Sequence, residues 1–79
     1  MSSKELNELK WQRPFRPFRL TTVNNEVFDI TTPGLILVGT HDLNIGIPHP
    51  TEPLPAVSDV IWIGVEDVVR VEMIEPIQA

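Results

Sequence analysis

The spacing of apolar and polar positions divides the chain into one short helix and a series of short strands. Leu6 and Leu9 lie three positions apart among charged residues, which predicts an amphipathic helix over residues 3–10. Ser2 or Ser3 is expected to cap this helix, and the glutamate three positions after Ser2 has the spacing of a capping box.

Beyond Pro14, which ends the helical stretch because the residue before a proline avoids helical geometry, the pattern becomes that of strands. Residues 18–23 and 26–31 are joined by Asn24-Asn25, and asparagine tolerates the left-handed conformations of tight turns. This arrangement predicts a hairpin. Further strand segments are expected at residues 35–39, 43–47, 57–65 and 69–74.

The strand segments favour a mostly β fold. We expect a short N-terminal helix followed by a five-stranded, strongly bent antiparallel barrel over residues 14–75, because closure removes unpaired strand edges. Four prolines predict a stiff loop over residues 48–56, and residues 76–79 are expected to form a tail. We interpret residues 1–79 as a single domain.

Two segments, at residues 35–38 and 61–63, are apolar on both faces. A strand of a small barrel should instead alternate apolar and polar residues. With 79 residues, no cysteine and one short helix, the chain has little with which to cover a second apolar face. We therefore predict a self-association interface that contains Trp62, Ile61, Ile63, Leu35 and Leu37. The alternative is that Trp62 forms the centre of the barrel core.

The charge is unevenly distributed along the chain. Residues 1–23 carry five Lys/Arg and two Glu, or +3, while residues 24–79 carry one Arg and nine acids, or −8, which together give the net charge of −5. Such asymmetry would steer a head-to-tail contact between copies, and a ring is one assembly that such a contact produces. The alternative is that these charges are solvated faces of little energetic weight.

Three arginines interleaved with phenylalanines make the only candidate nucleic-acid contact: Arg13, Arg16 and Arg19. Arginine holds phosphate and stacks on bases, and aromatic rings stack on bases as well. The competing interpretation is a structural first strand, because Phe18 alternates with Leu20 as core residues do. The acidic net charge argues against broad nucleic-acid affinity, and no DNA binding is expected.

The sequence offers little for catalysis or metal binding. Ser58 could be combined with His41 or His49, but its surroundings do not match a nucleophile elbow. The two histidines do not have the spacing of a known metal site. We expect neither catalytic residues nor a bound metal or cofactor, and we predict that the protein is not an enzyme.

The sequence also predicts the cellular compartment of the protein. The first eight residues have no apolar core typical of a signal peptide, and the longest apolar runs, at 35–38 and 60–63, are far shorter than a membrane span. The absence of cysteine fits a reducing compartment. We expect a cytoplasmic protein without a membrane partner.

The order of a helix, a hairpin, two further strands, a variable loop, a long strand and a final strand resembles the Sm-like fold. That resemblance implies small barrels that assemble into rings, many of which bind RNA. Where Sm proteins carry an aspartate–asparagine pair for RNA, the 35–43 region offers only Asp42 and the adjacent Asn44, and the bacterial tyrosine–lysine–histidine motif is missing. No RNA-binding residue is therefore carried over.

The segment 13–20, with its Arg-Pro-Phe-x-Pro-Phe opening, is similar to short bacterial proteins of unknown function. This similarity implies no activity. The sequence thus favours a non-enzymatic, homo-oligomeric structural or protein-interaction module of Sm-like fold. The alternative is a single-stranded RNA-binding Sm-like protein.

Overall fold

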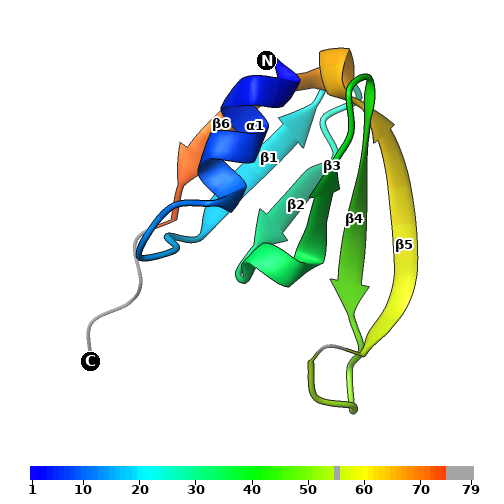
Figure 1. The fold of residues 1–79 in the computed structure, drawn as a ribbon. Helices are drawn as coiled ribbons and strands as arrows, with labels where there is room; N and C mark the ends of the chain where they lie inside the picture. The colour runs from blue at the N-terminus through cyan, green and yellow to red at the C-terminus, as the bar shows by residue number, and fades with distance from the viewer. Residues whose placement is uncertain (55, 75–79) are drawn as a thin grey trace.

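The structure, a computed structural model, describes residues 1–54 and 56–74. Position 75 of the predicted barrel, the predicted tail 76–79 and Pro55 of the proline-rich loop lie outside the described residues. Within them, one helix precedes six strands and two 3₁₀ turns (Figure 1). Their bounds are α1 (Ser3–Lys10), β1 (Phe18–Thr22), β2 (Val27–Ile30), η1 (Pro33–Leu35), β3 (Ile36–Val38), β4 (Asp42–Pro48), β5 (Val57–Gly64), η2 (Val65–Asp67) and β6 (Val68–Met73).

The predicted helix and its capping box are confirmed. The Ser2 hydroxyl accepts a hydrogen bond from the Glu5 backbone N–H at 3.2 Å and donates one to the Glu5 carboxylate at 3.2 Å. Helix α1 buries Leu6 completely. At the other end the Trp11 N–H donates to the Asn7 carbonyl at 3.0 Å. The Ser2 cap thus satisfies one of the N-terminal N–H groups that have no partner within the helix.

The strands form two antiparallel three-stranded sheets. Sheet A has the order β2-β1-β6, and sheet B has the order β3-β4-β5. The predicted hairpin is confirmed, since β1 pairs with β2 and Phe18 lies opposite Ile30. Asn25 takes the left-handed conformation that the turn requires, with φ of 64°.

The prediction of a closed, five-stranded barrel over residues 14–75 was wrong. The chain leaves sheet A through η1 and returns to it through η2, and the described residues form six strands in two separate sheets. Pro33 begins η1 and has no N–H to donate to a neighbouring strand. The chain is therefore broken between β2 and β3, and these two strands belong to different sheets.

The two corners where the chain changes sheets are tied to other elements. At η2, the Val65 N–H donates to the His41 carbonyl at 2.8 Å, and the Asp67 carbonyl accepts from the Val23 N–H at 2.8 Å. At η1, the Lys10 ammonium of α1 donates to the Pro33 carbonyl at 3.1 Å and also to the Ile36 carbonyl. These hydrogen bonds hold η2 to the β3–β4 turn and to the segment after β1, and they hold η1 to helix α1.

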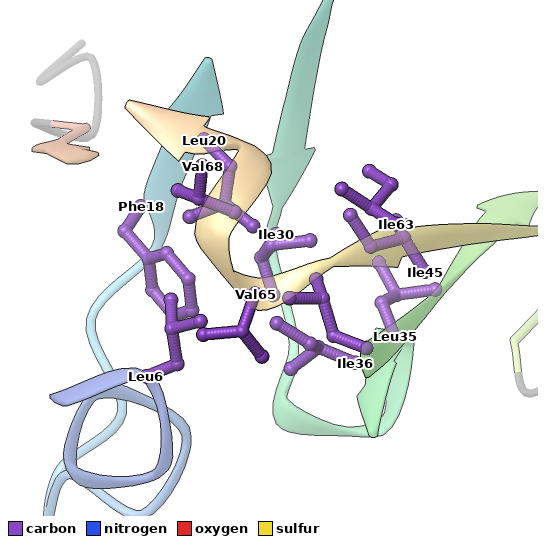
Figure 2. Packing of buried hydrophobic residues seen from close by; sticks show 11 residues of the cluster. Leu6, Phe18, Leu20, Ile30, Leu35, Ile36, Ile45, Ile63, Val65 and Val68 are labelled. Carbon is purple, nitrogen blue, oxygen red and sulfur yellow. The ribbon is translucent and has the colours of Figure 1, made fainter. Parts of the chain in front are cut away.

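The core lies between the inner faces of the two sheets and beneath α1. Figure 2 shows Leu6 directed from the helix toward Phe18, with Val65 of η2 beside the residues from β3 and β4. The buried apolar cluster draws on every element of the described fold: Leu6, Phe18, Leu20, Ile30, Leu35, Ile36, Leu43, Ile45, Ile63, Val65 and Val68. Removal of this apolar surface from water is the main force that holds the two sheets together.

Substitution of Gly46 tests how closely β4 and β5 are packed. A Cβ atom at this position would lie 2.9 Å from Val57 Cγ1, so Gly46→Ala should destabilise the fold by about 1–2 kcal/mol through overpacking. Gly34→Ala is the matched control, because a Cβ there meets nothing within 4 Å. Urea unfolding of both variants measures the difference. Equal midpoints would show that β5 shifts freely away from β4.

Substitution of Lys10 tests the tie between the helix and η1. Burial lowers the pKa of the Lys10 ammonium, because desolvation disfavours its charged form. Lys10→Met keeps the apolar stem but leaves two carbonyls without their donor, which should cost about 1–3 kcal/mol of unfolding free energy. Lys4→Met, an exposed site on the same helix, is the control. A Lys10→Met variant as stable as Lys4→Met would contradict a structural role for this tie.

Candidate interaction surface

The face of sheet B directed away from the core carries a row of exposed apolar side chains. Strand pairing places Leu37 opposite Asn44, and Asn44 opposite Trp62. Leu37 is 62% exposed and Trp62 is 71% exposed, although both lie in the middle of strands. Val60, two residues before Trp62 in β5, is also exposed. We call Leu37, Asn44, Val60 and Trp62 the outer face of sheet B.

The five residues predicted to form an interface separate into two groups. Leu35 and Ile63 lie in the core, and Ile61 is partly buried against it. Leu37 and Trp62 remain accessible on the outer face of sheet B. The alternative prediction, that Trp62 forms the centre of the core, was wrong, because β5 directs Ile63 inward and its neighbour outward.

A shallow depression of about 440 Å³ lies on this surface, where β3, β4 and β5 meet the β3–β4 turn. Its lining combines an indole, an amide and a carboxylate group, from Trp62, Asn44 and Asp42. The Asn44 Oδ1 atom is buried and has no hydrogen-bond partner among the described residues. An acceptor left in this state costs free energy.

Sheet B and its connecting segments are acidic. Residues 35–67 contain five carboxylates and no lysine or arginine. Those carboxylates are exposed, and they come from Asp42, Glu52, Asp59, Glu66 and Asp67. Within residues 1–54 and 56–74 the ion pairs are Arg19–Asp29 and Arg70–Glu72, so none of the five has a basic partner there. The sheet B side of the molecule therefore attracts cations.

Of the three arginines predicted as a nucleic-acid contact, Arg19 is engaged within the fold. It lies on the solvent face of sheet A, where its Nε donates to Asp29 Oδ1 at 2.7 Å and its Nη2 donates to Asp29 Oδ2 at 3.2 Å. Glu72 lies opposite on β6. The hydrogen bond from Arg19 lowers the pKa of the Asp29 carboxyl, and the same bond raises the pKa of the guanidinium.

Arg13 and Arg16 lie apart from Arg19, in the loop between α1 and β1, and both are exposed. Two contacts give this loop a defined shape. The Gln12 amide donates to the Leu9 carbonyl at 2.8 Å and to the Arg16 carbonyl at 3.2 Å. Phe15 packs on the core, with its ring centroid 5.9 Å from that of Phe18. The loop therefore presents its two arginines outward while its phenylalanine holds it to the domain.

The residues considered for catalysis and metal binding are dispersed. The Ser58 hydroxyl donates to the Ile47 carbonyl at 3.5 Å, whereas His41 lies in the β3–β4 turn. His49 serves the proline-rich loop, since its Nδ1 accepts from the backbone N–H groups of Thr51 at 3.1 Å and Glu52 at 3.0 Å. Among the described residues, no three His, Cys, Asp or Glu side chains are close enough to hold a metal ion.

The chain gave no match to a family model, a curated protein or a solved structure. In the part of the chain that the structure describes, no helix has the length and apolarity needed to cross a bilayer. The functional interpretation therefore depends on the surface itself, and chiefly on the outer face of sheet B.

The Arg19–Asp29 pair predicts a pH effect of definite sign. Because the folded-state pKa of Asp29 is lowered, the pair contributes stability above the ordinary carboxyl range near about pH 4, and this contribution is lost as the pH falls through the lowered pKa. Asp29→Asn should therefore reduce stability slightly at pH 7 and make the acid side of the profile shallower. The effect is small, because both side chains are well exposed and solvent screens the pair.

The measurement is urea unfolding from pH 7 down to pH 2. Glu26→Gln in the same hairpin removes a carboxylate that makes no ion pair among the described residues, and it serves as the control. Identical pH profiles for Asp29→Asn and Glu26→Gln would contradict the assigned role of the pair.

Proposed function

We propose that the protein is a non-enzymatic interaction module that associates with copies of itself through the outer face of sheet B. The observation that carries this proposal is the exposure of Trp62 and Leu37 on the same cross-strand row. Tryptophan is enriched at the centres of protein interfaces, where its large ring is removed from water. An indole 71% exposed in the middle of an eight-residue strand is of little use to the isolated domain.

The composition of this surface supports a protein partner. Leu37 and Trp62 share the depression with Asp42 and Asn44, so apolar and polar groups lie together as they do in protein interfaces. The site as a whole is an open, shallow surface and not an enclosed pocket.

The element order also supports a relationship to Sm-like proteins, as part of the same proposal. A helix is followed by a hairpin, a bend at η1, a second hairpin with a proline-rich loop, the η2 turn and a final strand. The complete absence of cysteine supports the proposed cytoplasmic location. Neither point identifies a biological process.

The test is the mass in solution. Size-exclusion chromatography with light scattering should show the native protein as a multiple of 8.9 kDa that dissociates on dilution. Trp62→Glu should weaken association by at least about tenfold, since it removes an aromatic contact and adds like charge to an acidic surface. Val69→Glu is the matched control, because Val69 is 59% exposed in β6, outside both sheet B and the α1–β1 loop.

An 8.9 kDa monomer at every concentration tested would contradict the proposal. Association that weakens equally in the Trp62→Glu and Val69→Glu variants would show that the outer face of sheet B is not the contact. Thermal unfolding of both variants at low protein concentration checks that each one folds.

A further inference from the structure

We propose that the occupant of the outer face of sheet B is the α1–β1 loop of a second copy, whose Arg13 or Arg16 enters the depression beside Trp62. This inference rests on the proposed function, which requires only self-association through sheet B. The inference adds that the surface contacting sheet B is the α1–β1 loop, which makes the contact between copies head-to-tail. It also gives a role to two exposed arginines that the fold itself does not use.

The depression has the groups that a guanidinium recognises. A guanidinium carries five N–H donors and no acceptor, and it stacks on aromatic rings. The lining offers the Trp62 ring for stacking, the polar side chain of Asn44 and the Asp42 carboxylate as a counter-charge. These three groups come from the neighbouring strands β4 and β5, with Asn44 directly opposite Trp62. Their combination favours arginine over an apolar side chain or a lysine.

The α1–β1 loop is the arginine source that the fold leaves unused. Lys10 is bound to the carbonyls at η1, Arg19 to Asp29, and Arg70 to Glu72. Arg13 and Arg16 are exposed and make no ion pair within residues 1–54 and 56–74. The Gln12 hydrogen bonds and the packing of Phe15 give the loop its shape before any partner binds. Such preorganisation reduces the entropy lost on association.

The position of the loop requires that this contact be made between copies. Figure 1 shows the loop between α1 and β1 on the side of the molecule opposite β5. The loop therefore cannot fold back onto the outer face of sheet B of its own chain. Two different surfaces that meet between identical copies form a heterologous contact, which closes into a ring or continues as a filament. The charge distribution, +3 over residues 1–23 and −8 over residues 24–79, favours the same orientation.

The first experiment is charge reversal in the loop. Arg13→Glu combined with Arg16→Glu should weaken association by at least about tenfold, as Trp62→Glu does, because it places carboxylates against an acidic surface. Arg13→Gln combined with Arg16→Gln is the milder variant and should show a smaller loss. The control is Arg70→Glu, a reversal on the exposed face of sheet A. Sedimentation velocity at several protein concentrations measures the dissociation constants.

The second experiment mixes two defective variants. The loop variant with both glutamates keeps an intact sheet B, and Trp62→Glu keeps an intact loop. A head-to-tail contact predicts that each is monomeric alone but that the mixture forms a one-to-one heterodimer through the single intact contact. The heterodimer should weaken when the ionic strength is raised to about 1 M, where charges are screened beyond about 3 Å.

The outcomes separate this inference from the proposed function. If Trp62→Glu dissociates the native assembly and the loop variant does not, self-association through sheet B stands and the loop is not its occupant. If the native protein is monomeric, both proposals fail. A third outcome is that the native protein binds a fluorescent oligouridine probe, whereas the loop variant no longer binds the probe but keeps the mass of the native assembly. In that case the two arginines bind RNA, and the inference is overturned.

Discussion

The fold depends on two corners at which the chain passes between its sheets, because no hydrogen-bonded pairing joins sheet A to sheet B among the described residues. Val65 N–H binds the turn of one hairpin, and the Asp67 carbonyl binds the segment that follows β1, so η2 is anchored to both sheets at once. At η1 the anchor is the Lys10 ammonium, supplied by the helix. The apolar core excludes water only while both corners keep the two sheets packed against each other.

The same corners decide which surfaces remain uncovered. Helix α1 is committed to the space between the sheets, since Leu6 is fully buried and Lys10 is bound at η1. It therefore cannot also cover the outer face of sheet B, where Trp62 lies. The solvent face of sheet A is more polar, because it carries the Arg19–Asp29 and Arg70–Glu72 pairs. The outer face of sheet B, with Trp62 71% exposed, therefore gains more from a partner.

Features set by near neighbours in the chain were predictable, and features set by distant pairing were not. The Ser2 cap and the left-handed Asn25 follow from residues a few positions away. The presence of strands also followed from the local pattern. Closure of a barrel, however, depends on which strand edges pair with each other. In addition, an unbroken apolar segment such as 35–38 does not indicate which of its side chains face the core. Asn44, between two core residues of β4, marked the outer side. This polar residue within the apolar stretch 43–47 was the overlooked local signal for the exposed face.

The pairing of β1 with β6 also has a consequence for synthesis on the ribosome. Sheet B is assembled from two successive hairpins, whereas Phe18 of β1 finds one of its strand partners only at Met73. Contacts so far apart in sequence form late. A nascent chain can therefore complete the acidic, tryptophan-bearing sheet while its first strand still lacks one of its two neighbours. The β1–β6 pairing and the hydrogen bond between Asp67 and Val23 form only when the C-terminal part of the chain has emerged.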